Sequence, residues 1–244
     1  MYIKIYAINL DGSVDRWKAL SQQATDLNIE LVRVPGVDGA QISAGDRIDF
    51  NELAFRRNNG RTVLPGEYGC YRSHLKALST FLNSDQPIGT IVEDDIELRP
   101  DLVEQVEAAF EALPKADVIK LFNHRTVWFK QHATSSLGTD IGRAAHGPQG
   151  STACSAVTRV GAARLLPVLA RMEYPWDVAL ERGWATGGEI YTTRRDLAAV
   201  KPQATTIASR RGYRASKFPW WRRLKTYCIR ITESVRRIGY AFRG

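Results

Sequence analysis

The sequence predicts an α/β fold in which a mostly parallel central sheet is flanked by helices. Short segments rich in β-branched and aromatic residues, such as 2–9, 30–34 and 88–92, have the length and composition of strands. Between them, apolar residues recur at three- and four-residue spacing, which is typical of amphipathic helices. Strands that alternate with helices form parallel sheets joined by helical crossovers. We therefore expect a single α/β domain followed by a C-terminal helix.

The first third of the chain opens with a β-α-β unit. A strand over 2–9 is followed by the turn and cap residues Asp11-Gly12-Ser13, and a second strand over 30–34 stops at Pro35-Gly36. From 37 to 63 the apolar pattern fades, and we expect a long, partly irregular excursion of a kind that is often functional. The helix between the two strands is predicted from the apolar positions Val14, Trp17, Leu20, Ala24 and Leu27.

A second helix starts at Pro65-Gly66, because proline favours the first turn of a helix, and it ends near Asn83-Ser84. Segment 138–150 is rich in glycine and small residues and is expected to be a loop that can move. The apolar stripe of the helix that starts at Pro65-Gly66 consists of Tyr71, Leu75, Leu78 and Leu82. The other expected elements are strands over 88–92, 117–122, 151–158, 190–192 and 197–200 and helices over 100–113 and 160–172.

The composition is that of a globular protein. The 244 residues include 34 Lys+Arg and 26 Asp+Glu, and 44% are hydrophobic, which excludes disorder and collagen-like repetition. No apolar run approaches the roughly 20 residues that cross a membrane, and the first residues lack the apolar core of a signal peptide. We therefore expect a cytoplasmic protein with reduced cysteines at Cys70, Cys154 and Cys228.

The positive charge is concentrated in the C-terminal segment. Residues 210–244 hold 11 basic residues and one acid, Glu233, a balance of +10, whereas residues 1–209 hold 23 basic and 25 acidic residues, a balance of −2. A near-neutral body with a basic tail is able to bind an anionic surface without involving the chemistry of the body. We therefore divide the chain into a domain over 1–209 and a tail over 210–244.

The tail predicts an amphipathic helix. After Pro219, apolar residues step by three and four positions and basic residues flank them, which is typical of a helix that lies on a membrane surface. We expect the tail to attach the protein peripherally to the anionic inner face of the inner membrane. The alternative is that the stripe packs on the domain or on a second copy of the chain. The stripe consists of Trp221, Leu224, Cys228, Ile231, Val235, Ile238 and Phe242.

Three consecutive carboxylates follow the strand over 88–92. Glu93, Asp94 and Asp95 lie at the carboxyl end of this strand, where open α/β sheets bind ligands. Carboxylates this close raise one another's pKa unless a cation neutralises them. Mg²⁺ or Mn²⁺ accepts such oxygen ligands and would bridge to a diphosphate. The alternative is a solvated acidic turn that caps the next element.

A second candidate cluster lies on the second predicted helix. Glu67, Cys70 and His74 are spaced i, i+3 and i+7 and share one face, while the helix N-terminus offers N–H groups to an anion. Without a ligand, Glu67 and His74 would form an intrahelical polar pair and Cys70 would be a core residue. Gly66 and Gly69 weaken the first turns of this helix, which indicates that something approaches the backbone there.

Two further groups of polar residues are candidates for the site. Asn9, Asp11 and Arg16 lie where the first strand ends and the first helix begins, a common place for a nucleotide, although a solvated helix face also explains Arg16. Asp177 follows the proline turn Tyr174-Pro175-Trp176 and is either a functional acid or a helix N-cap. The sequence has no phosphate loop and no Gly-x-Gly-x-x-Gly, Gly-x-Ser-x-Gly or His-Glu-x-x-His motif, which excludes the enzymes that these motifs mark.

Four of these motifs resemble, in the same order, those of glycosyltransferase family 25. They are Ile5-Tyr6-Ala7-Ile8-Asn9-Leu10 with Arg16, Val37-Asp38-Gly39, Gly66-Glu67-Tyr68-Gly69-Cys70 with Ser73-His74, and Val92-Glu93-Asp94-Asp95. The resemblance continues through 150–166, Pro175-Trp176-Asp177 and Ile190-Tyr191, and covers residues 2–203. This family includes bacterial lipopolysaccharide and lipooligosaccharide galactosyltransferases and is similar to the collagen galactosyltransferases. The resemblance implies a GT-A-like fold and inverting transfer of a hexose, usually galactose from UDP-galactose, to a sugar hydroxyl of a lipopolysaccharide or another cell-surface glycan.

The resemblance also implies roles for individual residues. Glu93-Asp94-Asp95 would serve as the Asp-x-Asp-like motif, with Asp95 as the first choice for the Mn²⁺ or Mg²⁺ ligand and Glu93 near the metal or the ribose. Many GT-A enzymes supply a late metal-binding histidine. The last histidine here, His146, would have to move in with its loop, or water would complete the coordination. Asn9, Leu10, Arg16, Asp38 and Asp94 would line the nucleotide pocket, and Arg72, Ser73 and His74 would face the donor phosphates.

Inversion requires one base that takes the proton from the acceptor hydroxyl. Asp177 is the candidate base, because it follows the acceptor-side segment and lies beside Trp176, whose ring would stack on a sugar. Glu67 and Glu189 are the reserve candidates for this role.

Two other classes of protein remain open. The basic tail with its interleaved aromatic residues also suits a non-catalytic nucleic-acid-binding protein, although the near-neutral domain argues against nucleic acid. The acidic strand end also suits a metal-dependent phosphohydrolase.

Overall fold

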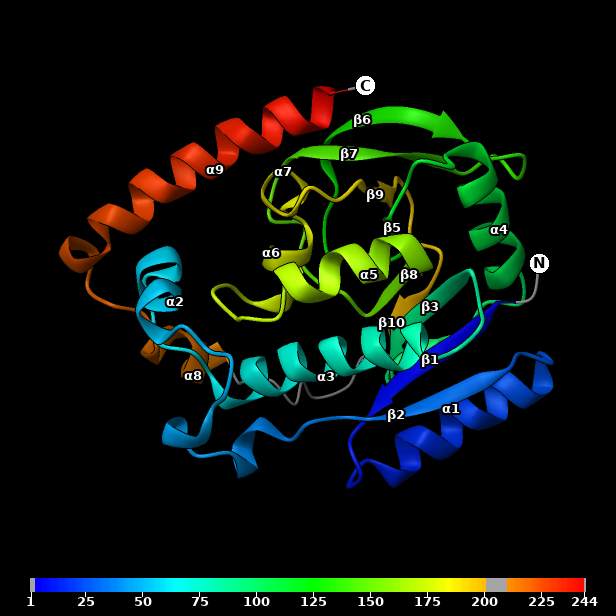
Figure 1. Ribbon diagram of the computed structural model, residues 1–244, viewed down its shortest axis with the longest axis horizontal. Helices are drawn as coiled ribbons and strands as arrows, with labels where there is room; N and C mark the ends of the chain where they lie inside the picture. Colours follow the sequence, from blue (N-terminus) through cyan, green and yellow to red (C-terminus); the bar gives the residue numbers. More distant parts are fainter. Residues whose placement is uncertain (1–2, 201–209, 244) are drawn as a thin grey trace.

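The computed structural model describes residues 3–200 and 210–243, and it has the predicted α/β architecture (Figure 1). An eight-stranded sheet forms the centre of the molecule, and helices cover both of its faces. Among the described residues, we find no helix that is both long and apolar enough to cross a membrane. The predicted fold class, a central sheet flanked by helices, is therefore confirmed.

The central sheet consists, in order across the sheet, of β2 (Leu31–Pro35), β1 (Lys4–Asn9), β3 (Ile88–Glu93), β8 (Cys154–Thr158), β5 (Val118–Lys120), β9 (Ile190–Thr193), β7 (Asp140–His146) and β6 (Val127–Thr134). β1 pairs in parallel with β2 and β3, and β5 pairs in parallel with β9. β8 and β7 are antiparallel to both of their neighbours. All strands of this sheet except β8 and β7 therefore point the same way, which confirms a mostly parallel sheet.

Two helical layers enclose the sheet. On one face lie α1 (Val14–Asp26) and α4 (Leu102–Ala112), and on the other lie α3 (Pro65–Leu82), α5 (Arg159–Val168) and α6 (Trp176–Leu180). Side chains alternate along the strands, so that in β1 Ile5 and Ala7 join the first core, whereas Tyr6 joins the second and contacts Phe81 of α3. The remaining α-helices are α2 (Glu52–Asn59), α7 (Gly183–Thr186), α8 (Arg210–Ala215) and α9 (Leu224–Phe242). Short 3₁₀ helices are η1 (Gly39–Gln41), η2 (Ala44–Asp46) and η3 (Trp220–Arg223). A separate two-stranded sheet pairs β4 (Ile96–Glu97) with β10 (Ala199–Val200).

Segment 138–150 is not a mobile loop, so this prediction is wrong. It contains β7, which forms a hairpin with the unexpected strand β6 and lies against α9. A Cβ on Gly142 would lie only 2.0 Å from the carbonyl oxygen of Lys130 on β6. The small residues of this segment therefore permit close packing of neighbouring backbones rather than motion.

The C-terminal helix α9 packs on the domain along β7 and beside α2 (Figure 1). The hydroxyl of Tyr240 donates to the carbonyl oxygen of Gly188 and accepts from the N–H of Ile190, both at 2.7 Å. The tail is therefore not detached from the domain. The boundary between residues 209 and 210 stays a prediction, because residues 201–209 lie outside the described part of the chain.

Candidate active site

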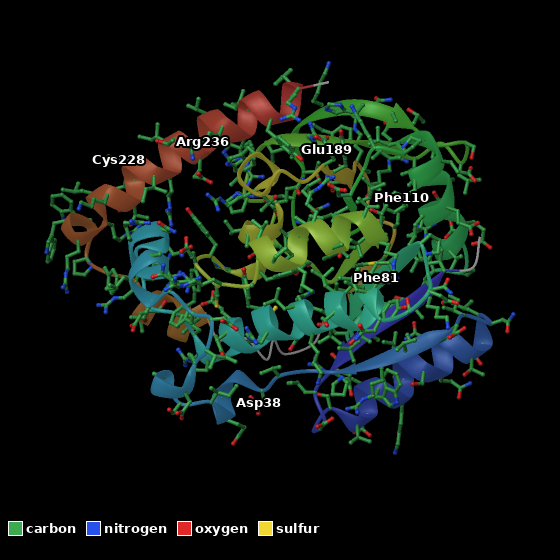
Figure 2. All side chains as sticks on the ribbon, in the orientation of Figure 1. Asp38, Phe81, Phe110, Glu189, Cys228 and Arg236 are labelled. Atoms are coloured by element: carbon green, nitrogen blue, oxygen red, sulfur yellow. The ribbon has the colours of Figure 1, made fainter. Side chains whose placement is uncertain are left out.

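A pocket opens at the carboxyl ends of β1 and β3, between η1 and the N-terminal half of α3. This is the edge at which open α/β sheets bind ligands. Figure 2 shows Asp38 at the lower edge of the molecule, where the pocket lies. The predicted residues that line it are Leu10, Arg16, Asp38, Ser73, His74, Glu93, Asp94 and Asp95, together with Ile8, Ser13, Val37, Gly39, Gly66 and Cys70.

Two residues of the first β-α unit hold the middle carboxylate of the acidic turn. Asn9 Nδ2 donates to Asp94 Oδ2 at 2.7 Å, and Arg16 Nη1 donates to Asp94 Oδ1 at 3.2 Å. Asn9 is buried, and its own Oδ1 accepts from Arg33 Nε at 2.9 Å, so its orientation is fixed. Asn9 thus acts on the pocket through Asp94, whereas Arg16 brings positive charge to the pocket wall.

Asp95 presents an oxygen that has no hydrogen-bond partner in the described part of the chain. Its Oδ1 is buried and makes no hydrogen bond to any described residue. Burial and the neighbouring carboxylates of Glu93 and Asp94 raise the pKa of Asp95 to about 6, and Arg16 opposes only part of this effect. A cation would relieve this penalty, and a set of carboxylate oxygens suits Mg²⁺ or Mn²⁺. Asp95 and Glu93 therefore fit the divalent metal that the resemblance implies, whereas a solvated acidic turn would not bury this oxygen.

The wall of the pocket depends on two glycines that allow η1 and α3 to touch. A Cβ on Gly69 would lie 2.4 Å from the carbonyl oxygen of Val37, and a Cβ on Gly39 would lie 1.9 Å from the carbonyl oxygen of Pro65. Ser73 Oγ reinforces this contact by accepting from the N–H of Val37 at 2.8 Å. The approach to the backbone predicted at Gly69 is therefore made by another segment of the same chain.

Two of the expected donor-binding residues have partners of their own. The Asp38 carboxylate lines the pocket and also caps η1, because its Oδ1 accepts from the N–H of Ala40 at 2.9 Å. Arg72 lies outside the pocket and pairs with Asp49, with 3.0 Å between Nη1 and Oδ2. The structure therefore does not bring Arg72 to the other donor-binding residues.

His74 is the histidine of the pocket. Its Nε2 lies 3.3 Å from Glu93 Oε1 and 3.4 Å from Thr152 Oγ1, and its ring stacks on that of Trp176 with centroids 5.0 Å apart. The ring of Trp176 also contacts that of Tyr71 edge-on, and the indole is buried in the second core. The expected stacking of Trp176 on a sugar is wrong, because the ring already packs between His74 and Tyr71.

The late histidine does not reach the pocket. His146 is the last residue of β7, and its ring contacts Trp128 at 5.7 Å. Because β7 is a paired strand, the expectation that His146 moves in with a loop is wrong. Within the pocket, however, Cys70 Sγ, a ring nitrogen of His74 and a carboxylate oxygen of Glu93 lie within 4.8 Å of one another.

Cys70 is a half-buried residue that lines the pocket and also packs against the second core. Burial, together with the carboxylates of Glu93 and Asp177, raises the pKa of the Cys70 thiol well above its ordinary value. The side chain is therefore a neutral thiol at neutral pH, next to the carboxylate of Glu93.

Comparison with known proteins agrees with this geometry. The family model of glycosyltransferase family 25, an LPS biosynthesis protein family, matches residues 2–139, which include every residue that lines the pocket. The chain belongs to glycosyltransferase family 25. No curated protein matches it. A solved structure of mouse xyloside xylosyltransferase 1 in its apo form is similar over 80% of this chain and 65% of that chain, with 12% identity and a TM-score of 0.33, and this level of similarity carries no argument about activity.

In this family 25 chain, Asp177 is a half-buried acid at the start of α6. It lies in the first turn of α6, whose N-cap is Pro175, so the alternative that Asp177 is the cap is wrong. Burial and the carboxylate of Glu181 raise the pKa of Asp177, and Lys120 opposes this. Asp177 is not among the residues that line the pocket, although its charge acts on the thiol of Cys70, which does line it.

The two reserve bases are already engaged in ion pairs. Arg61 binds both carboxylate oxygens of Glu67, which also accepts from the N–H of Leu64. Glu189 pairs with Arg143 and accepts from the hydroxyl of Tyr191 at 2.9 Å. Figure 2 shows Glu189 near the upper edge of the molecule, far from Asp38. The structure thus brings neither acid to the pocket, and the expected pair of Glu67 with His74 is replaced by the pair with Arg61.

Sequence reasoning missed a buried ion cluster beside Asp177. Lys120 Nζ lies 2.7 Å from Glu181 Oε1, and Arg237 Nη1 of α9 lies 3.0 Å from Glu181 Oε2. The N–H of Gln149 donates to both oxygens of Glu181. Lys120 could have indicated this cluster from the sequence, because a lysine within an apolar strand requires a buried anionic partner.

Proposed function

We propose that the protein is an inverting hexosyltransferase that uses a UDP-sugar, with galactose as the favoured sugar. The acceptor in this proposal is a sugar hydroxyl of a lipopolysaccharide or another cell-surface glycan, and Mn²⁺ or Mg²⁺ assists the reaction. Family membership supports glycosyl transfer in general. The observation that carries the finer proposal is the pocket, in which a buried, unpartnered oxygen of Asp95 lies beside the fixed carboxylate of Asp94 and the charge of Arg16.

On the donor side, each residue has a distinct task. Asp95 and Glu93 would hold the divalent metal, which supplies charge neutralisation for a diphosphate leaving group when it is bound. Arg16 adds positive charge on the same wall. Asn9 keeps Asp94 in place through the 2.7 Å hydrogen bond, so that Arg16 and the acidic turn keep their relative positions. This arrangement orients a nucleotide diphosphate at the carboxyl end of the sheet.

On the acceptor side, Asp177 is the proposed base. The acceptor oxygen forms its bond to the anomeric carbon while the bond between that carbon and the UDP oxygen breaks, and the hydroxyl proton moves to the Asp177 carboxylate. Burial and Glu181 raise the pKa of Asp177, which makes its carboxylate a stronger base than an exposed one. Lys120 opposes this increase in the pKa of Asp177 by favouring the charged form.

The test is incubation with a panel of UDP-sugars and Mn²⁺, with slow donor hydrolysis measured as UDP release. We expect one sugar to be preferred, and we expect Asp95→Asn to fold normally and lose most of the UDP release. The exposed Asp15→Asn is the control and should behave as the unmodified protein does. A rate close to that of the unmodified protein for Asp95→Asn at limiting Mn²⁺ would contradict the metal assignment.

Calorimetry separates this proposal from a phosphohydrolase. A transferase should bind UDP and Mn²⁺ in a mutually dependent way, because a metal held by Asp95 and Glu93 would neutralise charge on the diphosphate. Little binding of UDP at saturating Mn²⁺ would favour the phosphohydrolase, which needs no uridine contacts.

A further inference from the structure

We propose that η3 and α9 form a rigid membrane-docking face, whose outer side binds an anionic lipid bilayer while its inner side is fixed to the domain. The inference goes beyond glycosyl transfer, because it concerns where the protein lies rather than what it catalyses. It rests on three observations: the exposure of the apolar stripe, the contacts on the opposite side of the helix, and the distribution of charge.

The apolar stripe of α9 faces away from the domain. Its central residues Ile231 and Val235 are 67% and 64% exposed, although a helix that packed by its apolar side would bury both. The adjacent Trp220 and Trp221 of η3 are 66% and 59% exposed, and indole rings favour the interface between lipid and water. Leu224, Ile238 and Phe242 of the same stripe are also exposed, as is Cys228.

The opposite side of α9 carries the contacts that fix it. Arg237 ends in the buried ion cluster, 3.0 Å from Glu181, and Tyr240 exchanges hydrogen bonds with the backbone around β9. Thr226 Oγ1 donates to the carbonyl oxygen of Arg57 on α2 at 2.8 Å. These contacts lie near both ends of the helix, so α9 is held along its length and its outer side keeps a fixed orientation.

The charge on the outer side complements an anionic surface. Exposed basic side chains, including Arg222, Lys225 and Arg230, flank the stripe. The sole acid of the sequence segment 210–244, Glu233, is turned towards the domain and paired with Arg182. A basic, apolar face on which the described residues of η3 and α9 place no unpaired carboxylate matches the headgroups and acyl boundary of an anionic leaflet.

The same charge disfavours a second copy of the chain as the occupant. Two copies joined through this face would bring like charges together around the stripe, which opposes association. An anionic bilayer meets the same basic residues with opposite charge. We therefore assign the face to lipid and treat a dimer as an outcome that would refute the assignment.

Docking through this face leaves the pocket away from the bilayer. Cys228 and Arg236 of α9 lie at the upper left of Figure 2, whereas Asp38 of the pocket lies at the lower edge. Because α9 is fixed to the domain, the pocket would keep one orientation relative to the membrane. Such an arrangement suits an acceptor whose sugar extends from the lipid surface.

The experiment is co-sedimentation of the full chain with phosphatidylglycerol vesicles and with phosphatidylcholine vesicles, without any donor sugar. The unmodified protein should bind phosphatidylglycerol and lose binding as the salt concentration rises. The double variant Ile231→Ser with Val235→Ser should reduce the partition coefficient at least about ten-fold, because two exposed apolar side chains no longer enter the lipid. Arg222→Gln with Lys225→Gln should reduce it about 30-fold, since each basic residue near an anionic surface contributes about a five-fold factor.

The matched control is Val160→Ser with Val168→Ser, which changes two similarly exposed valines on α5. This variant should bind vesicles as the unmodified protein does. Unchanged binding by the stripe variant, or equal binding to both lipids, would overturn the proposal. So would a dimer in the absence of lipid that the stripe variant converts to a monomer. Point variants replace truncation here, because deleting α9 would remove Arg237 from the buried cluster.

Discussion

Replacing Glu181 by glutamine removes the carboxylate that binds both Lys120 and Arg237, with almost no change of shape. The Glu181 and Lys120 side chains are 2% and 1% exposed, so water cannot compensate the two cations after the change. A glutamine oxygen still accepts from the N–H of Gln149, so the variant isolates the loss of charge. We expect the folded state to survive with a clearly lower stability.

The magnitude follows from the burial of the cluster. Removing one partner of a buried ion pair destabilises a protein by about 3–5 kcal/mol. For a chain of this size, about 1 kcal/mol shifts Tm by roughly 2–4 °C, so the expected decrease is about 6–20 °C. Calorimetry or circular dichroism at pH 7 measures this decrease directly.

The difference between Glu181→Gln and the unmodified protein should depend on pH. Burial raises the pKa of Glu181, but Lys120 and Arg237 together outweigh it and hold the pKa below its ordinary value of 4.5. A carboxyl whose pKa is lowered on folding contributes stability above its unfolded-state pKa and loses it as the pH falls through that range. The difference in Tm should therefore be full at pH 7 and shrink below about pH 4.5.

Glu52→Gln is the control for this experiment. Glu52 pairs with Arg56 at 3.7 Å, and the two side chains are 59% and 40% exposed. An exposed pair contributes less than about 1 kcal/mol, so Tm should change by no more than about 2 °C. If Glu181→Gln behaves like this control, or if its difference in Tm is the same at pH 7 and pH 4, then the cluster is not an ionised buried network and the reasoning is refuted.

Two further predictions concern the candidate active site. Asp177→Asn should keep UDP affinity in calorimetry while it lowers turnover by about 10²–10⁴, the usual contribution of a positioned base. Loss of UDP binding as well would instead place Asp177 in the donor pocket or in the support of the fold. Gly69→Ala should destabilise the protein by about 1–3 kcal/mol and weaken UDP binding, because its Cβ would lie 2.4 Å from a backbone carbonyl oxygen. Gly12→Ala, where nothing lies within 4 Å, should change neither thermal unfolding nor UDP binding, and equal effects of the two alanines would contradict this account.

Features that depend on local pattern could be predicted from the sequence. The helix expected to begin at Pro65 is α3, and the strand expected before Glu93 is β3. Their spacing and end signals lie within one segment, so no knowledge of the rest of the fold was needed. The meeting of Arg16, Asp38 and His74 in one pocket agrees with what the family resemblance implied, whereas sheet geometry alone predicted a site only at the carboxyl ends of the strands.

Features that depend on distant partners could not be predicted. Glu181 lies 61 residues from Lys120 and 56 from Arg237 in the sequence, and no local pattern couples residues at such separations. The glycine and alanine residues of β7 resemble a loop until their close neighbours on β6 and α9 are known. From the sequence alone, Trp176 is predicted to be an exposed aromatic residue after a proline turn. Only the fold shows that the ring of His74 stacks on it.

The contact between Gly39 and Gly69 also constrains how this pocket is able to evolve. The atoms that a Cβ would meet at each position belong to the backbone, so no compensating side-chain change elsewhere is able to rescue a substitution. Both glycines should persist together in descendants that keep the pocket, even where the side chains lining it diverge. New sugar specificities would then arise by exchanging side chains on walls whose separation stays constant.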